Sequence, residues 1–340
     1  MIINKIKLVL LAAAFLCIGT NKAQNLEWGF NVGNFDTDSW SGGELKSNGD
    51  LVVYGFIYGG DLNPLGAPMQ AQGGNLINTY NSQGELVQSL PITADIRIKD
   101  LKLDADNNML VLASYQASNV DIDFGTGTNY IQLVDSSNYR NCYIAKYAPN
   151  GDLIWAKPFN YPYMISLNML RIATDAAGNA YLAGTFGNGL NDNFDVDFDA
   201  AVYNIRTLGL QDLFLTKYDA NDGHFLWGFN IGVPPQCWTG NCNAEEVYME
   251  GLAVDADGNA YITAHFGDSL DIDPNPNNIV GFNALNVATA LLKYNSNGNL
   301  VWGRHIGQNT AATTLKLSAR ANNGDLFLNY FCARDRKSVV

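Results

Sequence analysis

Two hairpin patterns alternate along almost the entire chain, and this repetition constrains the fold more than any other feature. The first pattern has a Lys-Tyr pair, a glycine turn and an apolar strand that ends in tryptophan; it occurs at 146–156, 217–228 and 293–303 and, more weakly, at 79–88. The second has an Asp- or Asn-rich turn followed by an apolar strand; it occurs at 45–58, 103–115, 174–187, 254–267 and 320–331. Self-similarity of this kind identifies a repeat architecture.

Each pattern predicts a β-hairpin, because Asn-Gly and Asp-Gly pairs readily adopt the positive φ angles of tight turns. The flanking runs are rich in Val, Ile, Leu, Tyr, Phe and Trp, as strands are, and no helical periodicity is visible after residue 24. One repeat is then two hairpins, or four strands, in roughly 60–75 residues. The fold class is therefore all-β, a β-propeller of repeated four-stranded blades with about four to five repeats present. The sequence leaves ring closure open.

The long polar stretch between the two hairpins of a repeat predicts a loop on one rim of the propeller. Tryptophan recurs at one repeat position, as Trp28, Trp155, Trp227 and Trp302, with Gln88 as the exception. A tryptophan inside a strand is expected to pack between neighbouring blades, since a buried indole contributes a large apolar area.

Residues 1–24 read as a secretory signal peptide, with Lys5 and Lys7 before a short apolar stretch at 8–18. Its removal takes away three lysines and no acidic residue, so the net charge falls from −13 to −16. Such an acidic chain is expected to avoid nucleic acid. No other segment is apolar for long enough to cross a bilayer, and we expect a secreted or cell-surface monomer.

Cysteine and tryptophan mark one insertion that breaks the repeat, CWTGNC at 237–242. In an oxidising compartment Cys237 and Cys242 are expected to pair and brace this loop. Trp238 between them is a candidate ligand-binding residue, because irregular loops on a rigid scaffold are where binding tends to occur. The alternative is a loop that packs on the rim.

The combination of D-x-x-G-N-A-Y, F-G, D-[IV]-D, L-x-K-Y and G-x-L-x-W resembles the SBBP-type β-propeller repeats of secreted proteins from Bacteroidetes and related bacteria. The likeness is strongest over 168–303. It implies a surface or secreted binding protein. The chain is thus expected to divide into a signal peptide at 1–24 and a propeller over 25–331, with repeats at about 26–88, 89–155, 156–227, 228–302 and a partial repeat at 303–331. The terminal DRKSVV reads like a translated sequencing adapter, so 332–340 are expected to be a non-native tail.

An Asp-x-Asp element recurs in the polar connections, and its six carboxylates are candidate calcium ligands: Asp121, Asp123, Asp195, Asp197, Asp271 and Asp273. Residues i and i+2 of an extended segment share a face, and oxygen-rich sites suit Ca²⁺. The competing interpretation is that these aspartates cap turns, which their repetition favours. No other cofactor is indicated.

No unique catalytic constellation is present, so the first hypothesis is a non-enzymatic binding or adhesion module whose rim loops bind protein or glycan. The second is an extracellular carbohydrate-active enzyme with acidic residues in the central channel. The third is a structural spacer of a larger surface adhesin. A unique acid cluster on the channel face would favour the second hypothesis.

Overall fold

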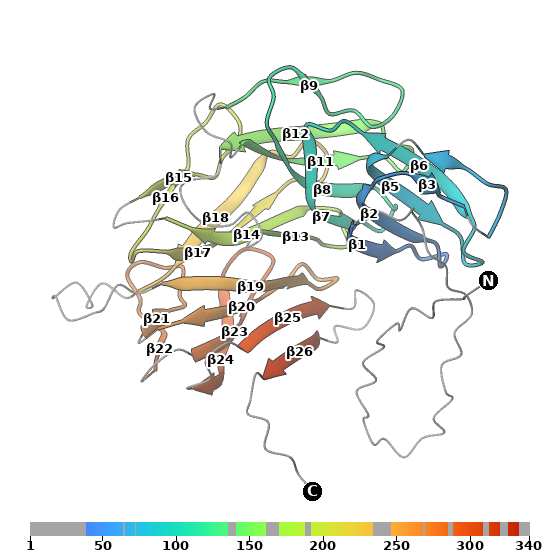
Figure 1. Cartoon of the computed structure of the whole chain (residues 1–340). Helices are drawn as coiled ribbons and strands as arrows, with labels where there is room; N and C mark the ends of the chain where they lie inside the picture. The colour runs from blue at the N-terminus through green and yellow to red at the C-terminus, as the bar shows by residue number, and fades with distance from the viewer. Residues whose placement is uncertain are drawn as a thin grey trace, which may run out of the picture.

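The computed structural model describes residues 39–63, 65–71, 73–134, 141–160, 170–187, 192–233, 246–267, 269–284 and 288–308, together with the backbone of 313–319 and 326–332. This part of the chain is all-β, and its secondary structure consists of strands and turns (Figure 1). The predicted fold class is confirmed, because the strands form repeated four-stranded antiparallel sheets, the blades of a propeller.

Four blades follow one another along the chain, each an antiparallel meander. Blade 1 comprises β1 (Ser39–Leu45), β2 (Leu51–Ile57), β5 (Gly74–Tyr80) and β6 (Leu86–Ile92). Blade 2 comprises β7 (Ile96–Leu103), β8 (Met109–Tyr115), β11 (Asn141–Tyr147) and β12 (Leu153–Asn160). Blade 3 comprises β13 (Arg171–Thr174), β14 (Ala180–Phe186), β17 (Asp212–Tyr218) and β18 (Phe225–Ile231). Blade 4 comprises β19 (Val247–Val254), β20 (Ala260–Phe266), β23 (Ala288–Tyr294) and β24 (Leu300–Gln308).

A fifth sheet follows blade 4 and is a single hairpin of β25 (Thr313–Ala319) and β26 (Leu326–Cys332). The first strands of successive blades contact one another in turn, from β1 to β7, β13, β19 and β25. These first strands therefore form the inner surface of the array, and β6, β12, β18 and β24 are the outermost strands of their sheets (Figure 1).

The turns inside the blades have the geometry that their glycines predict. Positive φ angles occur at Gly49, Gly84, Gly151, Gly178, Gly223, Gly258 and Gly298. Blade 2 uses Asn107 at the equivalent place, with φ of 62°. In the β19–β20 turn, the carboxylate of Asp255 accepts hydrogen bonds from the backbone of Asp257 (3.1 Å) and Asn259 (2.8 Å). The Asp and Gly residues of these turns thus serve the hairpin itself.

The predicted rim loop between the second and third strand of each blade instead contains a short hairpin. These hairpins are β3 (Gly60–Asp61) with β4 (Gln70–Ala71), β9 (Val120–Asp121) with β10 (Tyr130–Ile131), β15 (Asn193–Asp195) with β16 (Asn204–Arg206), and β21 (Ser269–Asp271) with β22 (Gly281–Asn283). The polar composition of the connection concealed them, because strands of two or three residues carry almost no periodicity.

Apolar side chains fill the spaces between adjacent blades. One buried cluster joins blades 1 and 2, a second joins blades 2 and 3, and a third joins blades 3 and 4. Both faces of these central strands are covered by neighbouring parts of the protein. The strands β8, β11, β14 and β17 are therefore buried along their whole length. Such strands read as near-continuous apolar runs rather than alternating ones.

Tryptophan and lysine side chains also fasten each blade to the next. Trp155 of blade 2 donates from Nε1 to the carbonyl of Ala220 in blade 3 (3.1 Å), and Trp227 of blade 3 donates to Ser296 in blade 4 (3.1 Å). Lys146 reaches the same Ala220 carbonyl (3.2 Å). The predicted packing of tryptophan between blades is confirmed for Trp155 and Trp227, whereas Trp28 lies outside the described residues.

Candidate functional site

Residues that recur in every blade maintain the fold, so a functional site is best sought where blades differ. The innermost strands differ most, and three of them contain a bulge that leaves one residue out of register: Ser41 in β1, Lys99 in β7 and Glu250 in β19. Bulges re-aim side chains and are common near functional sites. Serine, lysine and glutamate thus occupy equivalent positions on the inner surface.

A pocket of about 540 Å³ lies among these inner strands. Its charged and polar lining comes from all four blades and consists of Ser41, Tyr54, Lys99, Asp100, Lys102, Arg171 and Glu250. We call this space the channel pocket. Since the residue type at these equivalent positions changes from blade to blade, no structural requirement of the repeat explains the ionisable residues.

A lysine between two carboxylates dominates one side of the channel pocket. Lys102 forms an ion pair with Glu44, and its Nζ lies 3.6 Å from Oδ1 of Asp100. Burial alone would lower the pKa of Lys102, but Asp100 and Glu44 outweigh it and hold the pKa above its usual value. Lys102 is therefore a fixed positive charge between two acids.

Asp100 also joins blades 2 and 3. Its Oδ1 accepts a hydrogen bond from the backbone of Leu101 (3.0 Å), and its Oδ2 accepts one from Ile172 (3.1 Å). The pKa of Tyr54 is raised to about 12, mainly because the side chain is buried and secondly because the Asp100 carboxylate is close to it. Tyr54 accordingly stays a neutral hydroxyl in the pocket wall at physiological pH.

Glu250 and Arg171 also line the channel pocket. Burial raises the pKa of Glu250 above its usual value, and the Arg171 guanidinium opposes that shift. Arg171 itself donates from a guanidinium nitrogen to the carbonyl of Leu170 (2.8 Å). The pocket therefore presents a carboxyl whose protonation is made easier by burial, next to groups whose charge is fixed.

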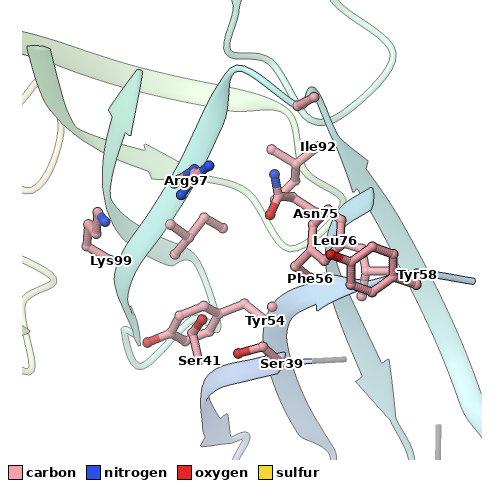
Figure 2. A pocket seen from close by; sticks show the side chains of 13 residues that line it. Ser39, Ser41, Tyr54, Phe56, Tyr58, Asn75, Leu76, Ile92, Arg97 and Lys99 are labelled. Carbon is pink, nitrogen blue, oxygen red and sulfur yellow. The ribbon is translucent and has the colours of Figure 1, made fainter. Parts of the chain in front are cut away.

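A second pocket, of about 560 Å³, adjoins the channel pocket between blades 1 and 2 (Figure 2). We call it the interblade pocket. It shares Ser41, Tyr54, Ile98 and Lys99 with the channel pocket. Together the two pockets form one recess on the inner surface, lined mostly by blades 1 and 2 and also by Arg171 of blade 3 and Glu250 of blade 4.

The structure places the six predicted calcium ligands in the short rim hairpins, each pair in its own blade. The first aspartate of each pair caps its hairpin: Oδ1 of Asp121 accepts from the backbone of Asp123 (3.1 Å) and Asn129 (2.8 Å). Asp195 and Asp271 make the equivalent pairs of bonds, with Asp197 and Tyr203 and with Asp273 and Val280.

The residue between the two aspartates anchors the rim hairpin to its blade. Ile122, Val196 and Ile272 are all buried. The Tyr218 hydroxyl donates to the Val196 carbonyl (2.9 Å), and Tyr294 donates to Ile272 (2.8 Å). Turn capping is thus a role that these aspartates have in the fold, while Ca²⁺ binding by them stays a prediction.

Blade 1 contains a fourth such element that the sequence pattern did not reveal. Oδ1 of Asp61 accepts from the backbone of Asn63 (3.0 Å) and Met69 (2.8 Å), and the buried Leu62 accepts from Tyr80 (2.9 Å). The signal was present as Asp-Leu-Asn, with asparagine in place of the second aspartate. An Asp-x-Asp pattern does not include this element, because its second residue is an amide rather than an acid.

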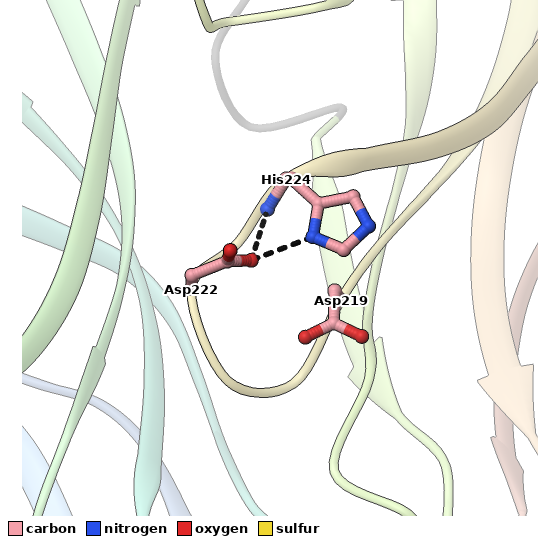
Figure 3. Close-up of side chains that lie close together, drawn as sticks. All are labelled: Asp219, Asp222 and His224. Carbon is pink, nitrogen blue, oxygen red and sulfur yellow. Dashed lines mark hydrogen bonds and ion pairs between the residues drawn. The ribbon is translucent and has the colours of Figure 1, made fainter.

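Among the described residues, one group of three ionisable side chains could hold a metal ion: Asp219, Asp222 and His224 (Figure 3). All three belong to the β17–β18 turn. His224 Nδ1 lies 2.7 Å from Oδ1 of Asp222, and Asp219 accepts from the backbone of Asn221 (2.8 Å). These contacts shape an exposed turn, as Asn81 and Asn295 do at the equivalent position in blades 1 and 4.

The predicted ligand-binding Trp238 and the predicted disulfide partners Cys237 and Cys242 lie outside the described residues. Cys142 is a buried free thiol, and burial raises its pKa to about 12. This cysteine is therefore a packing residue rather than a reactive one.

The residues of the channel pocket were not predicted from the sequence. Their signal was a departure from the repeat: the first strand reads IRIKDLKL in blade 2 but VYMEGLAV in blade 4. The blades are alike in their turns, whereas the channel pocket lies where their first strands differ.

Comparison with known proteins adds little. No known family profile matches the chain, and no curated protein matches its sequence. A protein of unknown function from Bacteroides caccae is similar in structure, with 9% identity, a TM-score of 0.31, and coverage of 79% of this chain and 82% of that one. A member of the DUF4221 family from Bacteroides vulgatus has 10% identity, a TM-score of 0.34 and coverage of 86% and 88%. Scores this low establish neither family nor function.

Within the described residues, no helix is long and apolar enough to cross a membrane.

Proposed function

We propose that this chain is a secreted or cell-surface binding module of the SBBP type, without catalytic activity, that takes a protein or glycan ligand. The observation that carries the proposal is the recess on the inner surface, lined mostly by blades 1 and 2. Its polar residues differ from blade to blade, while the turns, ion pairs and rim hairpins repeat. A concave site with a few convergent polar groups is where ligands usually bind.

The inner surface is favoured over the described rim hairpins as the binding site. The rim aspartates are engaged by backbone amides of their own hairpins. Lys99, in contrast, is half-buried at the bulge of β7 and makes no ion pair with any described residue. A cation left without an ion-pair partner beside a recess is available to a ligand.

Binding of the purified chain to a panel of polysaccharides and extracellular proteins tests this proposal, with Lys99→Glu as the site variant. Lys46→Glu is the matched control, since Lys46 lies in the β1–β2 turn and also makes no ion pair with a described residue. We expect a ligand that Lys99→Glu loses and Lys46→Glu retains. A ligand held equally by all three proteins would place binding elsewhere.

One observation favours catalysis as a second candidate. Glu250, whose pKa burial raises, lies in the same pocket as Asp100, which accepts two backbone hydrogen bonds. Two carboxyl groups in different surroundings are the pair that glycoside hydrolysis uses. Release of reducing sugar from a bound glycan, abolished in Glu250→Gln, would establish an enzyme; a bound glycan that stays intact supports the binding module.

A further inference from the structure

The interblade pocket carries an aromatic stripe that no other described blade has. Tyr54, Phe56 and Tyr58 alternate along β2 and its end, so they share one face of the strand. Counted from the turn, the equivalents of Phe56 are Ser114, Thr185 and His265, and those of Tyr58 are Gln116, Gly187 and Gly267. The repeat therefore does not require aromatic residues at these positions.

Two rings of this stripe face the pocket with much of their surface uncovered. Phe56 is 37% exposed and Tyr58 is 53% exposed. Their centroids lie 4.9 Å apart in an edge-to-face arrangement with an interplanar angle of 82°. Two rings at right angles offer a platform and a side wall, against which a flat ring with apolar C–H faces can pack.

Arg97 of β7 lies across the pocket from these rings (Figure 2). Within the described residues, Lys102, Lys146, Lys157, Lys217 and Lys293 each form an ion pair with a carboxylate, but Arg97 forms none. Lys46 and Arg304 also lack such a partner among the described residues, but neither lines the pocket, whereas Lys99 and the Arg97 guanidinium do. Its planar fork suits a carboxylate or sulfate, which it can bind through two parallel hydrogen bonds.

Small polar groups complete the lining. The Asn75 amide donates to the Ile96 carbonyl (3.0 Å), and its oxygen accepts no hydrogen bond from a described residue. Ser39 and Ser41 are exposed at the pocket edge. These groups can exchange hydrogen bonds with ligand hydroxyls, while Leu76 and Ile92 provide an apolar floor.

We propose that the interblade pocket binds a saccharide that carries an anionic group, a carboxylate or a sulfate. The sugar ring packs on Phe56 and Tyr58, Arg97 pairs with the anion, and Asn75 and the serines contact hydroxyls. This inference rests on the proposed binding function and specifies its ligand class. A neutral sugar would leave Arg97 desolvated without a partner, which is unfavourable.

Calorimetric titration with defined probes tests the inference: polygalacturonate for the carboxylate, dextran sulfate for the sulfate, neutral dextran, and benzoate as an aromatic acid without a sugar. We expect at least one acidic polysaccharide to bind and neutral dextran and benzoate not to bind. Arg97→Gln and Tyr58→Ala should each weaken that binding by roughly tenfold.

Two control variants match the site variants in chemistry and exposure. Tyr130→Ala removes a tyrosine that is 55% exposed on a rim hairpin, and Arg304→Gln removes an exposed arginine of β24. Both should bind like the unaltered protein. Equal loss in site and control variants would show nonspecific attraction and overturn the inference.

The remaining outcomes separate the two proposals. Binding of neutral dextran that Lys99→Glu abolishes would refute the anionic class but support a ligand site on the inner surface. Binding of benzoate as tight as that of any polysaccharide would replace the sugar with an aromatic acid. If none of the probes binds while another glycan or protein of the panel is lost in Lys99→Glu, the ligand class is wrong and the binding function stands.

Discussion

A lysine and an aspartate meet in the interior of three consecutive blades. Lys146 pairs with Asp104 (2.9 Å), Lys217 with Asp175 (3.1 Å), and Lys293 lies 3.9 Å from Asp255. Burial by itself would raise the pKa of Asp104, but hydrogen bonds from Lys146 and Asn108 hold it below its usual value. A buried charge is tolerable only with such a partner, so each pair ties the first turn of a blade to its third strand.

Replacing one member of a pair should destabilise the protein strongly. Lys217→Met leaves the Asp175 carboxylate buried without its cation, and we expect the free energy of unfolding to fall by about 3 kcal/mol. Urea denaturation measures this, with Lys46→Met as the control, because Lys46 has no carboxylate partner among the described residues. Equal midpoints for the two variants would contradict a stabilising role for the pair.

Asp212 should make stability depend on pH in the opposite sense to most acids. Burial raises its pKa to about 6, despite hydrogen bonds from Leu208, Gly209 and Asn230. Since the folded pKa exceeds the unfolded one, the stabilisation is full below about pH 4 and is lost as pH rises through about 6, amounting to about 3 kcal/mol. The difference in unfolding free energy between wild type and Asp212→Asn, measured from pH 4 to 8, should change by this amount; a pH-independent difference would contradict it.

At the scale of elements, a turn glycine and a tryptophan from the preceding blade form a matched pair. A Cβ at Gly223 would lie 2.6 Å from the Trp155 ring, and one at Gly298 would lie 3.1 Å from the Trp227 ring. Both glycines also have positive φ, 71° and 81°. The glycine is thus required twice, by the turn and by the blade that packs on it.

Gly223→Ala is expected to lower the free energy of unfolding by about 2 kcal/mol. Alanine would have to adopt the left-handed backbone conformation, and its Cβ would clash with the Trp155 indole. Gly267→Ala is the control, because no atom lies within 4 Å of its Cβ position and its φ is not positive. Thermal melts of the two variants compare them directly. A Gly223→Ala midpoint as high as that of Gly267→Ala would show that the turn and the indole readily adjust.

The rim hairpins provide the test of calcium binding. The second carboxylate oxygens of Asp121 and Asp195 accept no hydrogen bond from described residues and could ligate a cation. If the sequence prediction holds, millimolar Ca²⁺ raises the melting midpoint, EDTA reverses the rise, and Asp273→Asn reduces it. An unchanged midpoint would leave the aspartates as turn caps alone.

At the scale of the whole molecule, stability passes from blade to blade through shared faces. Three buried clusters each span two adjacent blades, Trp155 and Trp227 donate hydrogen bonds to the following blade, and the Lys102–Glu44 pair joins blade 2 to the preceding one. Such an array behaves as units coupled to their nearest neighbours. Damage at one interface should therefore stay local.

Trp227→Phe should show this locality, because it removes the hydrogen bond to Ser296 while keeping most of the apolar contact. We expect faster amide hydrogen exchange in β17, β18, β23 and β24, and unchanged exchange in β1, β2, β5 and β6. Exchange followed by mass spectrometry resolves these segments. Uniform acceleration in all blades would indicate a single cooperative unit.

The sequence determined the blade itself. Glycine and asparagine at turn positions are local requirements of φ, and runs rich in β-branched and aromatic residues are typical of strands, so both could be read without knowing the fold. The same holds for Trp155 and Trp227, whose recurrence marked a structural position. The short rim strands could not be predicted, because two or three residues are too few to show an alternation of buried and exposed positions.

Only the tertiary structure decided where a ligand can bind. Tyr54, Arg97 and Glu250 are far apart in the sequence and lie in three different blades. They line one recess because the first strands of successive blades pack side by side and because bulges re-aim single residues toward the inner surface. The repeated sequence pattern specifies the structure of a single blade. The site depends on the packing of several blades, which brings residues of different types together.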